Sequence, residues 1–261
     1  MIRSAIENLM DTVKQRIRVC EASIQPRVSR LRVDGASCLK LVRSLWWDET
    51  SAEWFQREIE PYFAASKRFH EYRIILDVGA ATGVFSLAAC ARFPSVKVYA
   101  FEPSHRQRIL LRRNVLRNAF ADRVAIEAFA AWNAKGEFRF RSNGAMSSLE
   151  ASGDLLAGLP FTERVRALPL DEWHAKQGSI PVNLIKMDIE GAELEALTGA
   201  NNLLEGSYPD LIVQAYHERE GHRTFERCAE LLARHGYICG EVGANSGLLF
   251  AEHPYRTAVP C

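Results

Sequence analysis

Short apolar runs alternate with stretches of helical periodicity along the chain from Arg73 onward. This alternation is typical of βαβ units, in which parallel strands form a sheet that helices cover on both faces. The runs predicted to be parallel strands cover residues 74–78, 96–101, 124–129, 184–188 and 211–215, and the helical stretches cover 84–92, 106–118 and 192–204. We therefore expect an α/β fold with one doubly wound, mostly parallel sheet.

Two segments depart from this alternation. Residues 137–141 alternate with period two and are followed by Asn143-Gly144, which is a strong turn signal. A β-rich insertion is therefore expected between the third and fourth parallel strands. Late in the chain, residues 236–242 and 247–251 indicate two closing strands, which predict a C-terminal antiparallel hairpin.

Residues 1–70 lack the alternation and are expected to form a mainly helical accessory region, with residues 71–261 as the main domain. Breaks are expected near Pro26, Asp34-Gly35 and Pro61. The first 17 residues place apolar side chains at helical spacing among charged ones, which predicts an N-terminal amphipathic helix. We expect this extension to dock on the core or to form a homo-oligomer with another copy of the chain. Binding to a membrane surface is the alternative.

The charge balance limits the classes of partner. Lys and Arg number 33 against 32 Asp and Glu, so the formal net charge is +1, which favours a small-molecule partner over nucleic acid. The sequence has no apolar run of about 18 residues, so no membrane span is expected. The six cysteines contain no CxxC pair, which argues against a zinc site or a disulfide framework. A reducing compartment, the cytoplasm, is the expected location.

The loop after the first predicted strand and the end of the second strand indicate a cofactor site. The loop contains Gly79 and Gly83 and opens a helix, so its backbone can approach a ligand at the carboxyl edge of the sheet. Glu102 ends the second strand, where a carboxylate can accept hydrogen bonds from two ribose hydroxyls. Ala130 and Ala131 follow the third strand, and their small side chains leave room for a flat base. Together they predict a nucleoside-containing cofactor.

The spacing within the loop distinguishes between such cofactors. Gly79 and Gly83 are separated by three residues, so the G-x-G-x-x-G pattern that seats a dinucleotide pyrophosphate is not reproduced. Asp77 precedes the loop and suits a cationic amino group better than a pyrophosphate, because like charges repel. S-adenosylmethionine (SAM) carries such an amino group. The alternatives are that Asp77 fixes the loop by accepting backbone amides and that Glu102 is a solvated carboxylate.

Four blocks of sequence, spanning about residues 73–218, resemble the FkbM family of SAM-dependent methyltransferases. The blocks are Leu76-Asp77-Val78-Gly79-Ala80-Ala81-Thr82-Gly83, then Phe101-Glu102-Pro103-Ser104 with Asn114 and Asn118, then Leu170-Asp171-Glu172-Trp173, and Ile185-Lys186-Met187-Asp188-Ile189-Glu190-Gly191-Ala192-Glu193. The last block is the most specific. The N-terminal region is not covered by the resemblance.

The resemblance implies a class I Rossmann-like methyltransferase fold and transfer to a hydroxyl oxygen, with sugars and polyketide-type natural products among the family's acceptors. The expected cofactor-binding residues are Asp77, Gly79, Ala80, Gly83, Glu102, Pro103, Ala130 and Ala131. The sequence departs from the family at Ala81, where Asn is frequent. It also departs at residues 214–218, where the family often has a Glu followed closely by His.

Asp188, Glu190 and His217 are the candidate catalytic residues, because the ends of the fourth and fifth parallel strands meet at the carboxyl edge. Asp188 has three open roles, which are to bind a divalent cation, to act as a base and to orient the SAM amino group. No other metal ligand is predicted. His217 is either a base or a histidine hydrogen-bonded at a strand end. Glu193 lies in the first turn of the following helix, where a negative side chain interacts favourably with the helix dipole. Lys186 lies inside an apolar strand, where a buried ammonium group requires a partner.

The sequence therefore predicts a SAM-dependent O-methyltransferase that acts on a sugar or on a small natural-product or glycan acceptor. A nucleic-acid methyltransferase would share the cofactor half, but the amino-directed enzymes of that class usually carry two prolines and an aromatic residue where Ile189, Glu190 and Gly191 stand. A basic stripe for phosphate contacts is also lacking. A nicotinamide oxidoreductase and a non-catalytic SAM-binding partner protein are the remaining alternatives.

Overall fold

A computed structural model of the chain describes residues 28–33, 38–42, 52–141, 148–150, 162–219 and 221–255. The predicted N-terminal amphipathic helix and the turn at Asn143-Gly144 lie outside the described residues, so both stay predictions. In the part of the chain that is described, no helix has the length and apolar character needed to cross a membrane.

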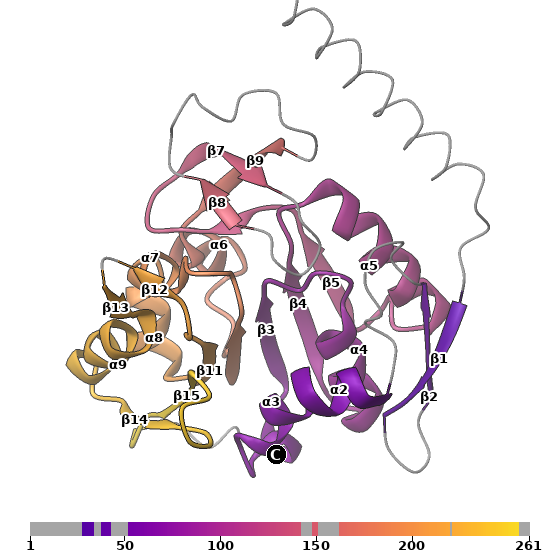
Figure 1. Cartoon of the computed structure of the whole chain (residues 1–261), viewed down its shortest axis with the longest axis horizontal. Coiled ribbons are helices and arrows are strands. Elements are labelled where there is room, and N and C mark those ends of the chain that lie inside the picture. Colours follow the sequence, from indigo (N-terminus) through magenta and orange to yellow (C-terminus); the bar gives the residue numbers. More distant parts are fainter. Residues whose placement is uncertain are drawn as a thin grey trace, which may run out of the picture.

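The central sheet contains seven strands in the order β14-β15-β11-β10-β3-β4-β5 (Figure 1). The neighbours from β11 to β5 run parallel, whereas β15 is antiparallel to both β11 and β14. The strands are β3 (Ile74–Val78), β4 (Lys97–Phe101), β5 (Val124–Glu127), β10 (Leu184–Met187), β11 (Asp210–Gln214), β14 (Ile238–Glu241) and β15 (Leu248–Glu252). The predicted doubly wound sheet with its C-terminal antiparallel hairpin is confirmed.

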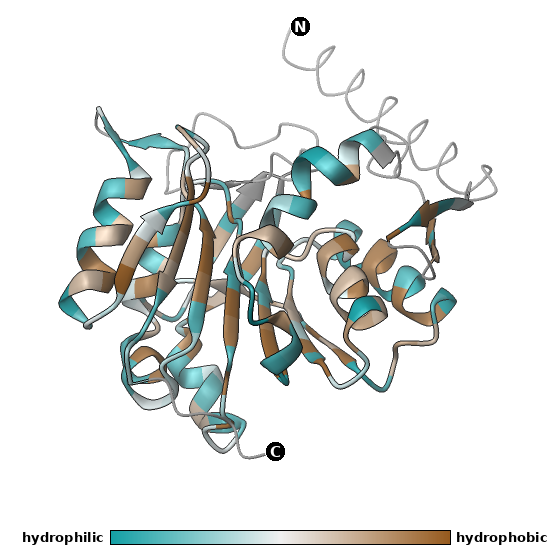
Figure 2. Cartoon of the chain, turned by 90° about the horizontal axis from the view of Figure 1, so that it is seen from below, coloured by the Kyte–Doolittle hydropathy of each residue, from teal (hydrophilic) through white to brown (hydrophobic). Residues whose placement is uncertain are grey.

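Helices cover both faces of this sheet, which explains why its strands are apolar along most of their length (Figure 2). Successive side chains of β3 alternate between two cores, since Ile75 packs with α4 and α5 and Leu76 packs with α6 to α9. The helices are α4 (Val84–Arg92), α5 (His105–Arg117), α6 (Leu170–Lys176), α7 (Glu193–Thr198), α8 (Asn201–Ser207) and α9 (Thr224–Arg234).

The stretch 192–204, expected to be one helix, is divided into α7 and α8 near Gly199. A Cβ atom at Gly199 would lie 2.1 Å from the carbonyl oxygen of Trp132, so this position requires glycine for a close backbone approach. The helices α6 and α9 were not among the helical stretches expected from periodicity.

A second sheet of four strands lies between β5 and β10 in the chain and stands apart from the central sheet in Figure 1. Its strands are β6 (Ala130–Ala131), β7 (Gly136–Arg141), β8 (Ser148–Glu150) and β9 (Thr162–Leu168), in the order β6-β9-β7-β8. The predicted β-rich insertion is thus confirmed. Ala130 and Ala131, expected in a loop, form the strand β6 and pair with Ala167 and Leu168 of β9.

Residues 28–42, inside the region expected to be mainly helical, contain a β-hairpin instead. Strands β1 (Val28–Arg32) and β2 (Cys38–Val42) pair antiparallel, and Leu31, Leu39 and Leu41 are buried against the core on the α4 and α5 side. Asn118 at the end of α5 accepts a hydrogen bond from the Lys40 backbone and donates one back to it. The alternation of the hairpin has a period of two, but it is short and interrupted by charged residues, so the sequence does not predict it.

Residues 52–71, which precede β3, contain helices. These are α2 (Ala52–Glu58), α3 (Glu60–Ala64) and the short 3₁₀ helix η1 (Phe69–Glu71). Phe55 and Phe69 of this segment are buried in the same core as α4. The segment therefore packs against the central sheet's own helices, next to the site described below.

Candidate active site

A cavity of about 660 Å³ opens at the carboxyl ends of the central strands. The chain runs from β3 outward to β4 and β5 and then returns to β10 on the other side of β3, so the loops after β3 and β10 diverge. Such a switch point is where open α/β sheets bind ligands. The volume lies within the roughly 300–1,000 Å³ of small-molecule sites.

Gly79 begins the loop after β3 and lines the cavity. Its φ is 81°, and a Cβ atom there would lie 1.9 Å from the carbonyl oxygen of Asp188. The close approach of the loops after β3 and β10 is therefore sufficient to require glycine here. The backbone amides of Gly79 and Ala80 both donate to the Phe101 carbonyl at 3.0 Å, which fixes the loop to β4.

Gly83 does not line the cavity, which corrects its assignment as a residue that approaches the ligand. It precedes α4 with a φ of 88°, and the side chain of Leu111 occupies the space that a Cβ atom would need. The positive φ of Gly83 allows α4 to begin here, and the absence of a side chain allows Leu111 of α5 to pack against the first turn of α4.

Asp77 also lies beneath the cavity and not in its wall. The side chain is completely buried, with one carboxylate oxygen 3.1 Å from Lys186 Nζ and the other accepting the Ser86 hydroxyl at 2.5 Å. Lys186 donates in addition to the Gly79 carbonyl at 3.1 Å, so it has the buried partners that its position required. The contact of Asp77 with a ligand amino group that the sequence favoured is thus replaced by an ion pair under the loop. No backbone amide donates to Asp77 within the described residues.

Glu102, at the end of β4, lines the cavity and is only 5% exposed. One carboxylate oxygen accepts the Ala81 amide at 2.8 Å and the other accepts the Ser104 amide at 2.7 Å. Burial raises the pKa of Glu102 to about 7, although both amides act in the opposite direction. Each oxygen keeps a further lone pair, so the fixed carboxylate can still accept two hydroxyl donors.

The wall beside Glu102 is small and apolar. Pro103, Ala130 and Ala131 line the cavity together with the aromatic side chains of Phe101 and Phe129, whose rings meet edge to face at 5.2 Å. Small and apolar side chains therefore lie next to the two fixed acceptor oxygens of Glu102.

Asp188 follows β10 and faces a partner that the sequence did not reveal. The hydroxyl of Tyr62 in α3 donates a hydrogen bond to Asp188 Oδ2 at 2.9 Å, and both residues line the cavity. Burial, followed by the negative charge of Asp188, raises the pKa of Tyr62 well above its usual value, so the phenol stays a donor. The two residues are 126 positions apart, and no local pattern in the sequence links them.

Glu190 and His217, both candidate catalytic residues, are brought into contact. His217 Nε2 lies 3.0 Å from Glu190 Oε2, and Glu190 lines the cavity while His217 stands behind it. The hydrogen bond to Glu190 raises the pKa of His217, whose ring is partly buried. Tyr216 approaches the same Glu190 oxygen at 3.5 Å. The pair can therefore take up a proton at the edge of the cavity.

Glu193 supports this pair from beneath. It is buried, and its Oε1 accepts the Gly191 amide at 3.0 Å, so it fixes the turn that carries Glu190. Burial raises its pKa, and it interacts electrostatically with His217. Within the described residues, Glu193 Oε2 and His217 Nδ1 are buried without hydrogen-bond partners. Glu193 therefore does more than favour the helix dipole.

The opposite wall of the cavity comes from segments that the sequence resemblance did not reach. Trp54 and Ile59 belong to the α2–α3 region, and Val242, Ser246 and Leu248 belong to the hairpin of β14 and β15. Across the described ranges, no group of three or more His, Cys, Asp or Glu side chains is arranged to hold a metal ion.

A family model described as the methyltransferase FkbM domain matches residues 77–239, which is more than half of the chain. The chain belongs to the FkbM family of methyltransferases. The family predicted from the four sequence blocks is thereby confirmed. The match begins at Asp77, so Tyr62 and the α2–α3 wall of this FkbM-family chain precede it.

Two curated relatives of this FkbM-family chain are each 27% identical to it. The AMB antimetabolite synthetase AmbE of Pseudomonas aeruginosa aligns over 199 residues, which are 63% of this chain and 9% of the synthetase. The 31-O-demethyl-FK506 methyltransferase FkbM of Streptomyces tacrolimicus aligns over 206 residues, which are 68% of this chain and 76% of that enzyme.

A solved FkbM methyltransferase from Methylobacillus flagellatus KT shares the fold, with a TM-score of 0.51 and 20% identity over 77% of this chain. The chain spans 50% of that protein's length. The likeness establishes the Rossmann-like methyltransferase fold, in agreement with the strand order of the central sheet.

Proposed function

We propose that this FkbM-family methyltransferase transfers a methyl group from SAM to a hydroxyl oxygen of a sugar or of a small natural-product or glycan acceptor. The observation that carries the proposal is Glu102, whose two oxygens are fixed by backbone amides at the wall of the cavity. The small apolar side chains beside it suit the adenine of SAM. The name of the Streptomyces relative, a 31-O-demethyl-FK506 methyltransferase, supports a hydroxyl acceptor on a natural product.

The candidate catalytic residues supply what methyl transfer to oxygen requires. SAM provides an electrophilic methyl group on its sulfonium. As the acceptor oxygen forms its bond to the methyl carbon, the carbon–sulfur bond breaks and the hydroxyl proton must leave. Asp188, in the cavity wall, is placed to accept that proton, and Glu190 with His217 forms a second proton-accepting pair nearby. These carboxylates also favour the binding of a cationic sulfonium.

Calorimetric titration with SAM and with NADH is the first test. We expect SAM to bind and NADH not to bind, because the loop after β3 lacks the pyrophosphate-seating pattern. Absence of SAM binding would overturn the proposal.

Replacing Asp188 by Ala is expected to lower methyl transfer by roughly 10²–10⁴-fold, the usual contribution of a general base. The measurement is transfer of a labelled methyl group to extracts of the source cells, with mass spectrometry of the product. Unchanged turnover would remove Asp188 from the mechanism. Activity that survives EDTA would remove the alternative in which Asp188 binds a divalent cation.

The same assay distinguishes the alternative functions. Label appearing in nucleic acid would favour a nucleic-acid methyltransferase, and SAM binding without any transfer would favour a non-catalytic role.

The affinity for SAM is expected to fall as the pH is lowered through 7. Glu102 has a pKa of about 7, and only its ionised form accepts hydrogen bonds from both ribose hydroxyls, so protonation competes with binding. Well below pH 7 the dissociation constant should rise about tenfold per pH unit. The amino and carboxyl groups of SAM keep their charges between about pH 5 and 7. The variant Glu102→Gln should bind weakly with little dependence on pH, and a flat profile in the unmodified protein would contradict the assignment.

A further inference from the structure

We propose that Tyr62 is a positioning residue for methyl transfer, which holds the Asp188 carboxylate in one orientation at the cavity. The inference rests on the proposed function. It assigns a role in the reaction to the segment before Asp77, which the family match does not include.

The backbone of Asp188 is fixed independently of Tyr62. Its amide donates to the Val78 carbonyl at 3.0 Å, and its carbonyl oxygen packs against Gly79 so closely that no Cβ atom would fit there. The remaining freedom of Asp188 is rotation of its side chain. The hydrogen bond from Tyr62 to Oδ2 removes that freedom, and no hydrogen bond in the described part of the chain engages Oδ1. Oδ1 is thus available to take the hydroxyl proton of the methyl acceptor.

Tyr62 is itself held by contacts that do not depend on its hydroxyl. Its ring meets Phe85 of α4 edge to face at 5.8 Å, and Lys186 Nζ lies 5.3 Å from the ring centre. Glu60, two residues before Tyr62, forms an ion pair with Arg92 at the end of α4. The distance from Arg92 Nη1 to Glu60 Oε2 is 2.9 Å. The ring therefore stays in place when the hydroxyl is removed, and Tyr62→Phe tests the hydrogen bond alone.

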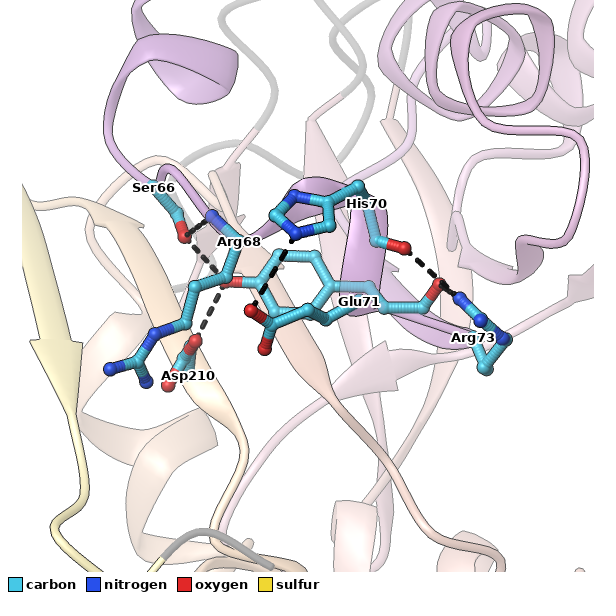
Figure 3. A network of polar contacts seen from close by, with 7 residues as sticks. Ser66, Arg68, His70, Glu71, Arg73 and Asp210 are labelled. Carbon is cyan, nitrogen blue, oxygen red and sulfur yellow. Dashed lines mark hydrogen bonds and ion pairs between the residues drawn. The ribbon is translucent and has the colours of Figure 1, made fainter. Parts of the chain in front are cut away.

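The chain offers a matched control in Tyr72 and Asp210. The Tyr72 hydroxyl donates to the Asp210 carboxylate at 2.7 Å within the polar network of Figure 3, and both residues are fully buried. Asp210 begins β11, at the amino end of the sheet and away from the cavity. Tyr72→Phe therefore removes a tyrosine–aspartate hydrogen bond, together with the 2.7 Å contact of the same hydroxyl with Ser66, without touching the site.

The experiment compares the unmodified full-length chain with Tyr62→Phe, Tyr72→Phe, Asp188→Ala and the double variant Tyr62→Phe/Asp188→Ala. The readouts are SAM affinity by calorimetry, labelled-methyl transfer to cell extract, and deuterium exchange of residues 188–192. We expect Tyr62→Phe to lower transfer by about 10–100-fold, because a hydrogen bond to a charged group is lost. SAM affinity should stay within about twofold, and exchange at 188–192 should stay unchanged, because the backbone there is fixed without the Tyr62 hydroxyl. Tyr72→Phe should change none of these.

The double variant separates positioning from general destabilisation. If Tyr62 acts through Asp188, removing its hydroxyl in the Asp188→Ala background should cost less than about twofold in transfer, a non-additive result. Additive losses would overturn the proposal, as would faster exchange at 188–192 in Tyr62→Phe, because the hydroxyl would then order the backbone and not the Asp188 side chain alone. Unchanged transfer in Tyr62→Phe would overturn it as well. Failure of the unmodified chain to bind SAM would instead overturn the proposed function.

Discussion

Replacing Lys186 by Met is expected to destabilise the protein by about 3–5 kcal/mol, because it leaves the completely buried Asp77 carboxylate without its cation. For a chain of this size, such a loss should lower the melting temperature by roughly 6–20 °C. The measurement is urea unfolding followed by circular dichroism. Lys97→Met, at an exposed position of β4, should change stability by no more than about 0.5 kcal/mol.

The double variant Asp77→Asn/Lys186→Met should be much more stable than the sum of the two single losses predicts, because it buries no unpaired charge. Equal unfolding midpoints for Lys186→Met and the unmodified protein would show that the ion pair contributes nothing to the folded state.

The second large effect is expected at Glu102. Replacement by Ala removes an ionised acceptor for two ribose hydroxyls, and hydrogen bonds to charged groups contribute about 1.5–3 kcal/mol each. The dissociation constant for SAM should therefore rise by roughly 10²–10⁴-fold, as measured by calorimetry. Glu127 ends the neighbouring strand β5 and does not line the cavity, so Glu127→Ala should bind SAM normally. A Glu102→Ala variant that keeps its affinity would exclude the ribose contact.

The sequence predicted the middle of the central sheet well because β3, β10 and β11 are buried on both faces and appear as mostly apolar runs. Ile75 and Leu76 illustrate this, since they are neighbours that enter opposite cores. The same method failed for the hairpin of β1 and β2. There Leu31, Leu39 and Leu41 are buried, and they alternate with the exposed charged residues Arg30, Arg32 and Lys40.

At the site, the sequence placed eight of its eleven candidate residues at the cavity, namely Gly79, Ala80, Glu102, Pro103, Ala130, Ala131, Asp188 and Glu190. These residues end or follow strands, and topology brings strand ends together. Asp77, Gly83 and His217 lie behind the wall, because strand register alone does not distinguish a side chain under a loop from one above it. Tyr62 was missed since its contact with Asp188 depends on how α3 packs, which no local pattern specifies.

The α2 helix presents some side chains to the core and others to the cavity. Positions that affect the stability of the fold therefore differ from positions that affect the choice of acceptor. Phe55 anchors the helix in the core, whereas Trp54, Arg57 and Glu58 face the cavity. Trp54 also packs against the core, so substitutions at the exposed Arg57 and Glu58 are the ones that can reshape the cavity with little effect on folding. Libraries varied at these codons, with Phe55 and Tyr62 held constant, are a direct route to retargeting this scaffold.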